Sequence, residues 1–252
     1  MATNKMKSVS FKQIMSFGIV AGVAMLMSGH ASFALTSHTL AQQLASMEAE
    51  RSTRLAHAQE LLGTGYSQSI ANSSSSVVQI REFIYGSTKK ELKGKWKMYS
   101  PAVASTILEQ AHQFGFDPIF LMAVIENESS FNPSIVGSHG EVGLMQITPV
   151  TAQWISEKYG VTYKGKGTLF DPVSNIKIGA AYLSFLRGKY NFKSKLYLSA
   201  YNMGATCLKR ALSHRKIPHQ YVSHVMERYV RFYSEIRTTP ATAKTLIASR
   251  GF

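Results

Sequence analysis

The chain has 252 residues, of which 45% are hydrophobic and 11% aromatic, so a core can form and a wholly disordered protein is excluded. Lys and Arg outnumber Asp and Glu by 28 to 14, and the formal charge of +14 favours an anionic partner: nucleic acid, an anionic membrane surface or an acidic cell-wall polymer. The single cysteine, Cys207, excludes an intrachain disulfide and a cysteine-rich zinc site.

The start of the chain has the three parts of a secretory signal peptide. Three lysines precede an uncharged run over 14–27, and small residues follow over 29–34. The uncharged run has about 14 residues, whereas a membrane-spanning helix needs roughly 20. We therefore expect export to the periplasm, with cleavage after Ala34 or, alternatively, after Ala31.

Export also narrows the choice of partner. The three lysines are the only charged side chains in 1–34, so the mature chain keeps a charge of +11. Outside the cytoplasm, an anionic polymer such as peptidoglycan or teichoic acid is a better partner than nucleic acid, which we do not expect. The alternative to cleavage is a short uncleaved anchor; we expect no stable membrane span, and no cysteine lies near the cut to make a lipoprotein.

An amphipathic helix is predicted over 40–62, ended by Gly63. Its apolar stripe is Leu40, Leu44, Met47, Leu55, Ala58 and Leu62. The serine run at 73–76 reads as a linker. The lysines that follow, at 89, 90, 93, 95 and 97, form either a solvated face or a contact surface for an anionic wall.

From 101 onward the pattern is densely helical. A helix over 101–114 ends at Gly115, and the next stretch, 119–125, is apolar on every side and should be central and buried. A capping residue followed by proline opens three helices, at Asp117-Pro118, Thr148-Pro149 and Asp171-Pro172, and apolar spacing marks a last helix near 221–230. Strand signals are almost absent, so the fold class is mainly α.

The expected division of the chain is a signal peptide over 1–34, a helical extension and serine-rich linker over 35–76, a basic connecting segment over 77–100, a catalytic domain over 101–238 and a tail over 239–252. Every motif follows 101, so a chain beginning near Tyr99 is expected to fold and to act. The stripe in 40–62 must be buried either on the catalytic domain or on another protein.

Two carboxylates end the apolar helix, Glu126 and Glu128. Residues two apart on a helix point about 200° apart, so the two cannot share one site. Burial and the negative end of the helix dipole both raise a carboxyl pKa, as a general acid near neutral pH requires.

Four motifs follow one another in the second half of the chain: Glu-Ser at 128–129, Gly-Glu-Val-Gly-Leu-Met-Gln at 140–146, Gly-Ala-Ala-Tyr-Leu at 179–183 and Ala-Tyr-Asn-Met-Gly at 200–204. Over 101–236 this set resembles the catalytic domain of soluble lytic transglycosylases of the SLT type, which cut the glycan strands of peptidoglycan. The resemblance implies a lysozyme-like (goose-type) helical domain with an N-terminal helical extension.

The resemblance also implies site residues. Glu128 falls on the family's catalytic acid, Gln146 lines the glycan groove, and the Tyr201 hydroxyl approaches the catalytic carboxyl and the scissile sugar. Met145 and Asn202 match positions that shape the cleft. Two departures matter: Gly137 stands where the family often has serine, so that Ser138 takes over that contact or the contact is absent, and Glu141 replaces a small residue.

The implied reaction needs one carboxylic acid, no cofactor and no metal. Glu128 protonates the glycosidic oxygen between N-acetylmuramic acid and N-acetylglucosamine, then takes the proton of the muramoyl 6-hydroxyl as a 1,6-anhydro ring closes. One alternative is a lysozyme-like hydrolase in which Glu141 or Asp171 positions water. The other is an inactive wall-binding assembly factor. The amphipathic segment before Ser73 is a candidate for docking to a secretion, pilus or conjugation machine.

Other kinds of site are not indicated. His214, His219 and His224 recur every five residues, which does not place them on one helical face as zinc ligands. The chain has no glycine-rich phosphate loop that ends in Gly-Lys-Ser/Thr. Cys207 follows the last motif with no base assigned to it, which indicates an inert thiol.

Overall fold

The computed structural model describes residues 39–72, 75–215 and 219–238, so the expected signal peptide and tail lie outside the described residues. The chain divides into two units, Met1–Ala49 and Glu50–Phe252. Of the first unit the structure describes 39–49, which are helical and carry the exposed Leu40 and Leu44. The helix that begins there continues to residue 62.

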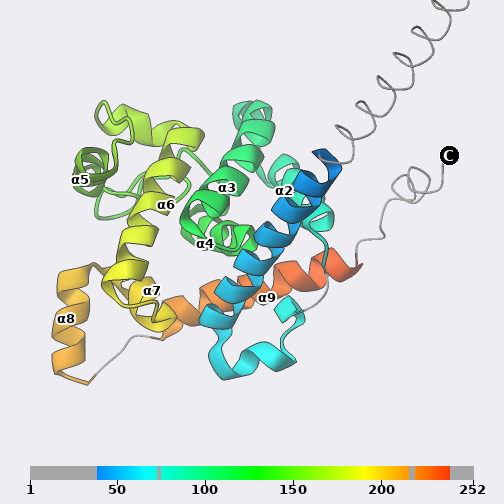
Figure 1. The fold of residues 1–252 in the computed structure, drawn as a ribbon. Helices are drawn as coiled ribbons and strands as arrows, with labels where there is room; N and C mark the ends of the chain where they lie inside the picture. Colours follow the sequence, from blue (N-terminus) through cyan, green and yellow to red (C-terminus); the bar gives the residue numbers. More distant parts are fainter. Residues whose placement is uncertain (1–38, 73–74, 216–218, 239–252) are drawn as a thin grey trace, which may run out of the picture. The chain divides into compact units, whose positions relative to one another are not determined.

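The described residues form helices joined by short loops, which confirms the mainly α class (Figure 1). After the helix over 39–62 the elements are η1 (Gly63–Gln68), η2 (Ile70–Asn72), α2 (Val77–Glu91), η3 (Gly94–Tyr99), α3 (Ser100–Phe114), α4 (Pro118–Ser129), α5 (Pro149–Tyr159), η4 (Lys166–Phe170), α6 (Pro172–Lys189), α7 (Ser194–Met203), α8 (Ala205–Ser213) and α9 (Gln220–Thr238). None of the described helices is long and apolar enough to span a membrane.

Helix α4 lies at the centre of the larger unit, as its all-round apolar sequence predicts. Its residues from Ile119 to Ile125 are fully buried, and it packs against α2, α3 and α9 (Figure 1). Each of the three predicted caps forms. The side chain of Asp117 accepts from the Ile119 N–H, Thr148 accepts from Thr151 N–H and Asp171 accepts from Ser174 N–H.

A buried polar cluster fixes the start of α4. The Oδ2 atom of Asp117 accepts hydrogen bonds from Tyr229 at 2.7 Å and Tyr233 at 2.6 Å, both on α9. Arg54 donates to the Tyr233 hydroxyl at 2.9 Å, and the Asp117 N–H donates to His57 Nδ1 at 3.0 Å. Apart from Arg54 Nε, the buried side-chain nitrogen and oxygen atoms of the described residues have hydrogen-bond partners, and the cluster ties three segments that are distant in sequence.

The segment 50–100 and the described residues of 101–238 belong to one compact unit, Glu50–Phe252. The face of the N-terminal helix that is buried differs from the predicted stripe. Arg54, His57, Ala58 and Leu61 are buried, whereas Leu55 and Leu62 are half-buried. An arginine and a histidine occupy two of the core-facing positions, which is why apolar spacing placed the stripe one residue off.

Candidate active site

An open cavity of about 560 Å³ lies at the end of α4. The loop between α4 and α5, the first turn of α5, α6 and α7 form its other walls. Its lining includes Glu128, Gly137, Ser138, His139, Glu141, Gln146, Thr148, Thr151, Tyr182, Tyr201 and Asn202. Five of the six predicted site residues therefore meet at one cavity, although they come from three separate segments: α4, the loop that follows it, and α7.

Glu128 is the acid of this cavity. The pKa of its carboxyl is raised to about 7: burial raises it most, a hydrogen bond from Tyr221 lowers it, and the negative charge of Glu141 raises it. A carboxyl with this pKa is protonated in a large fraction of molecules at neutral pH. It can therefore give a proton to a leaving oxygen and then act as a base.

The partner of Glu128 is Tyr221 of α9, whose hydroxyl donates to Glu128 Oε1. The sequence reading placed Tyr221 only in the apolar pattern of the last helix and assigned the approach to the carboxyl to Tyr201. In the structure the Tyr201 hydroxyl donates to the Met145 carbonyl at 2.8 Å. Tyr201 thus holds the loop while its ring packs against Tyr182, and burial together with the nearby charge of Glu128 raises the pKa of its hydroxyl well above the usual value.

Glu126 faces the other way, as the helical spacing predicts. Its carboxylate pairs with Arg231 and lies 3.8 Å from Arg228, both on α9. It does not line the cavity. The two carboxylates thus have different surroundings. Glu126 faces two guanidinium groups, whereas Glu128 lines the cavity and accepts a hydrogen bond from Tyr221.

Ser129 and Asn175 hold the loop that carries Gln146. Ser129 is buried and its hydroxyl donates to the carbonyl of Leu144 at 2.8 Å, which joins the end of α4 to this loop. Asn175 Nδ2 donates to the carbonyls of Val142 and Leu169, and its Oδ1 accepts from the Met145 N–H at 2.7 Å. These bonds fix Gln146, whose φ of 46° lies in the left-handed region that non-glycine residues rarely adopt.

Met145 itself does not face the cavity. Its side chain is fully buried against Gly179, where an added Cβ would come within 2.8 Å of the Met145 Cβ. The side chain thus lies in the core behind the loop, where Gly179 of the Gly-Ala-Ala motif supplies the space that Met145 fills. Gln146 donates from Nε2 to the Gly143 carbonyl at 2.9 Å, which leaves its Oε1 on the cavity side.

Glu141 and Gly137 form a matched pair at the loop. A Cβ at position 137 would collide with the Glu141 carboxylate and come within 2.8 Å of Gln146 Oε1. A serine at 137 would therefore require the Glu141 and Gln146 side chains to shift. Glu141 Oε2 accepts from the His139 N–H at 3.0 Å, and Ser138 is exposed, with its hydroxyl 3.2 Å from His139 Nδ1. The two departures from the family's pattern, Gly137 and Glu141, thus lie next to each other in the structure.

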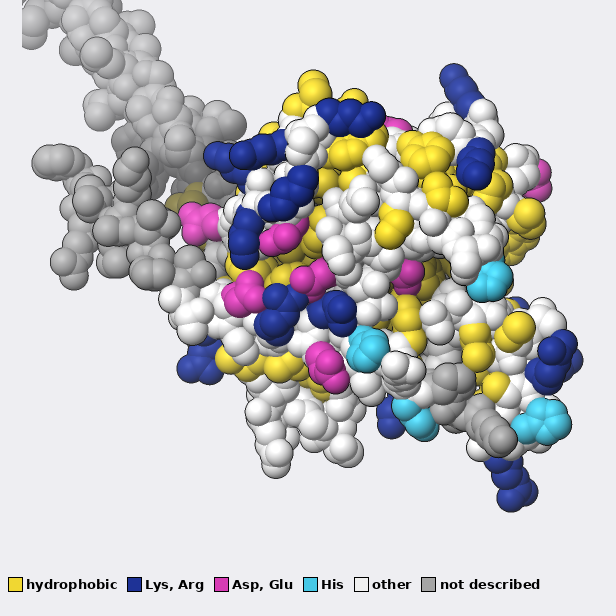
Figure 2. Space-filling view, turned by 180° about the vertical axis from the view of Figure 1, so that it is seen from behind, with side chains coloured by type: hydrophobic (Ala, Val, Ile, Leu, Met, Phe, Trp, Pro, Cys, Tyr) yellow, Lys and Arg dark blue, Asp and Glu magenta, His cyan; other side chains and the backbone are white. Residues whose placement is uncertain are grey.

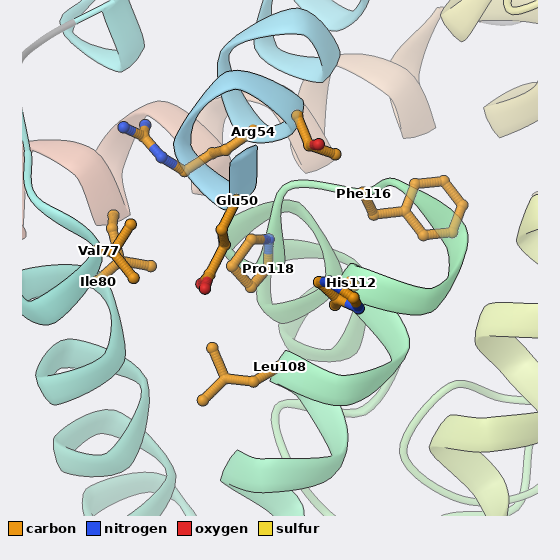
Figure 3. Close-up of a pocket in the computed structure, with 10 residues that line it drawn as sticks. Glu50, Arg54, Val77, Ile80, Leu108, His112, Phe116 and Pro118 are labelled. Carbon is orange, nitrogen blue, oxygen red and sulfur yellow. The ribbon is translucent and has the colours of Figure 1, made fainter. Parts of the chain in front are cut away.

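The remaining candidates play no evident part. Asp171 caps α6 and does not line the cavity. Cys207 is exposed at the cavity edge. A second cavity, between the N-terminal helix, α2 and α3, measures only about 20 Å³, which is room for one water molecule and not for a sugar (Figure 3).

We expect a Tyr221→Phe substitution to move the pH profile of activity. The lost hydrogen bond stabilises the carboxylate, so its removal raises the pKa of Glu128 and shifts the alkaline limb of kcat/KM to higher pH. The peak rate should fall because the carboxyl is no longer oriented. Tyr201→Phe is the matched control: its hydroxyl bonds a backbone carbonyl, so its alkaline limb should stay in place. An alkaline limb of kcat/KM at the same pH in the wild type and in both variants would contradict this role of Tyr221.

Comparison with known proteins agrees with this geometry. Residues 105–222 match the family model of the transglycosylase SLT domain. The chain is 35% identical over 123 residues to membrane-bound lytic murein transglycosylase C from Haemophilus influenzae, covering 44% of this chain and 33% of that protein. It is 37% identical over 113 residues to the protein of the same name from Histophilus somni, covering 41% and 31%. The chain thus spans about a third of the length of these curated relatives.

Among solved structures, the 70-kDa soluble lytic transglycosylase from Escherichia coli superposes with a TM-score of 0.50 at 22% identity. The superposition covers 67% of this chain and 32% of the other. A likeness at this identity speaks for the fold, and it confirms the lysozyme-like helical architecture expected from the motifs.

Proposed function

We propose, from the transglycosylase SLT domain that residues 105–222 form, that the chain is a peptidoglycan lytic transglycosylase. Its substrate is the β-1,4 bond between N-acetylmuramic acid and N-acetylglucosamine, and its product is a 1,6-anhydromuramoyl end. The observation that carries the proposal is a carboxyl with a raised pKa, Glu128, at the wall of a cavity wide enough for sugars.

The reaction follows from the two states of Glu128. In its protonated form it gives its proton to the glycosidic oxygen while the bond to the muramoyl C1 breaks, and the acetamido group of the substrate stabilises the cationic centre. The resulting carboxylate then removes the proton of the 6-hydroxyl, whose oxygen bonds to C1. The atoms balance without water, and Glu128 ends as it began.

The other residues of the cavity have supporting roles in this proposal. Tyr221 orients the Glu128 carboxyl, and Tyr201 holds the loop through the Met145 carbonyl. Gln146, Asn202 and Ser138 line the groove and contact the glycan. The catalytic domain covers 101–238, supported by the segment 50–100.

Export through a signal peptide over 1–34 places the enzyme in the periplasm, where its polymer lies. The basic composition fits this setting, because glycan strands with peptide stems carry carboxylates.

A hydrolase is the second candidate, favoured by one observation: Glu141 is a further carboxylate on the same cavity. The product decides between them. Purified sacculi treated with the enzyme should give muropeptides that end in anhydromuramic acid, detected by mass spectrometry. Reducing ends, 18 mass units heavier by one water, would instead establish hydrolysis, and the absence of both products would overturn the proposed activity.

We expect Glu141→Gln to shift the alkaline limb of kcat/KM to lower pH. The Glu141 charge raises the pKa of Glu128, so its neutralisation lowers that pKa. His139 faces Glu141, and Tyr201 and Tyr221 face Glu128, so these groups are left unchanged. Glu157→Gln, a change on α5 away from the cavity, is the control and should leave the limb in place. A glutamine variant of Glu141 with the wild-type limb would show that the two carboxylates are not coupled.

A further inference from the structure

A second surface lies beside the cavity, and its first part, 95–98, precedes the residues that match the family model. It is formed by η3 and by the start of the loop after α4. We call it the η3 platform and define it as Lys95, Trp96, Met98, Ile135 and Val136. Of its side chains, Met98 is 78% exposed, Val136 48% and Ile135 37%. Large apolar side chains grouped at a surface mark a contact site.

Hydrogen bonds connect the platform to the cavity, and Val136 directly precedes Gly137, which lines the cavity. Trp96 Nε1 donates to Ser134 Oγ at 2.9 Å, and the Trp96 ring packs against Tyr99 with centroids 5.6 Å apart. The next residue of the loop, Ile135, accepts from the Gly143 N–H at 3.0 Å and from Gln146 Nε2 at 3.3 Å. Two consecutive residues therefore join Trp96 to the Gln146 wall of the cavity.

Positive charge surrounds this apolar surface. Lys95 Nζ lies 4.9 Å from the centroid of the Trp96 ring, and the segment 89–97 holds five lysines against one acid, Glu91. Figure 2 shows Lys and Arg side chains gathered around exposed hydrophobic side chains on one face of the molecule. A ligand of this surface needs an apolar face for the aromatic ring and carboxylates for the lysines.

We propose that the η3 platform binds the peptidoglycan strand beyond the cavity, with a sugar ring on Trp96 and the carboxylates of the strand on the lysines. The proposal rests on the proposed function and deepens it. A sugar ring presents an apolar face of C–H groups that stacks on aromatic rings, while lactyl and peptide carboxylates pair with Lys95 and Lys97. Continuity with the cavity favours a strand that occupies both sites over a lipid surface.

The first test measures binding without cleavage, in a Glu128→Gln background. Trp96→Ala should weaken binding of long, peptide-bearing glycan strands about tenfold, the size of one good contact. Binding of a tetrasaccharide, which fills only the cavity, should be unchanged. Phe192→Ala is the matched control, because Phe192 is also an exposed aromatic ring beside a cation, Arg187, but does not line the cavity. The Phe192→Ala variant should bind the long strands and the tetrasaccharide as tightly as the Glu128→Gln protein does.

Three outcomes overturn the proposal: equal binding of long strands by the Trp96 variant, equal losses for the strand and the tetrasaccharide, or binding of anionic phospholipid vesicles that depends on Trp96 while strand binding does not. A Lys95→Glu, Lys97→Glu variant separates the two parts of the site. It should weaken peptide-bearing strands more than strands stripped of peptide. Failure of the proposed activity would appear instead as the absence of product from the unsubstituted enzyme, whatever the binding result.

Discussion

Replacing Glu128 with glutamine should abolish cleavage of peptidoglycan. Glutamine keeps the shape of the side chain but can neither give a proton to the leaving oxygen nor take one from the 6-hydroxyl. Loss of general acid–base catalysis costs roughly 10²- to 10⁴-fold in rate, and here one group does both steps. The measurement is the rate of release of anhydromuropeptides from sacculi.

Glu126→Gln is the matched control, since it makes the same change two residues away on the same helix. The Glu126 carboxylate pairs with Arg231 and does not line the cavity, so most of the activity should remain. Loss of this surface ion pair should lower the free energy of unfolding by less than about 1 kcal/mol. A dead Glu126 variant beside an active Glu128 variant would reverse the assignment.

The Glu128→Gln substitution should not destabilise the fold, and its effect on stability depends on pH. The pKa of Glu128 is higher in the folded protein, about 7, than in the unfolded chain, so its contribution to stability is present at low pH and is lost as pH rises toward 7. The Glu128→Gln variant lacks this loss. The difference between its melting temperature and that of the wild type should therefore increase in favour of the variant between about pH 5 and pH 8. A variant that melts far below the wild type at both pH values would mean that inactivity reflects misfolding.

Removing the residues before Tyr99 should destabilise the protein severely, in contrast to the expectation from the sequence. The removed segment buries Leu61, Val77, Ile80, Ile84 and Leu92 in the core. At about 1.5–3 kcal/mol for each large apolar side chain, the loss is on the order of 10 kcal/mol, comparable with the whole stability of a typical domain. Arg54 and His57, which bond around Asp117, would be lost as well.

Thermal unfolding followed by circular dichroism tests this expectation. A chain that begins at Glu50 is the control, because the compact unit begins there, and it should melt as the full chain does. A chain from Tyr99 that melts at the same temperature as the chain from Glu50 would show that the segment 50–98 adds nothing to the fold.

Local sequence rules predicted much of this architecture. The caps at Asp117, Thr148 and Asp171 form as expected, because a side chain that bonds the first free N–H groups acts within one turn. The burial of α4 followed from its lack of a polar face, and the separation of Glu126 from Glu128 followed from helical geometry. Glu128 itself was found through a resemblance of motifs, and its place on the cavity agrees with it.

Contacts between distant segments were beyond these rules. Tyr221 lies 93 residues after Glu128 and looks like one more apolar position of its helix, so only the packing of α9 on α4 brings its hydroxyl to the carboxyl. Met145 belongs to a conspicuous motif, yet the space above Gly179 turns its side chain into the core. The role of Gly137 is likewise visible only once Glu141 is seen to fill the space above it.

The sequence by itself thus determined the helical class, the helix starts and the opposite directions of Glu126 and Glu128, since these depend on neighbouring residues. The tertiary structure alone decided which tyrosine bonds Glu128 and where the compact unit begins. The second point turns on Arg54 and His57, polar residues that a hydrophobic pattern assigns to the surface. Residues elsewhere in the chain compensate their burial: Arg54 donates to Tyr233 and to the Ser75 carbonyl, and His57 accepts from the Asp117 N–H, which cannot be read from local spacing.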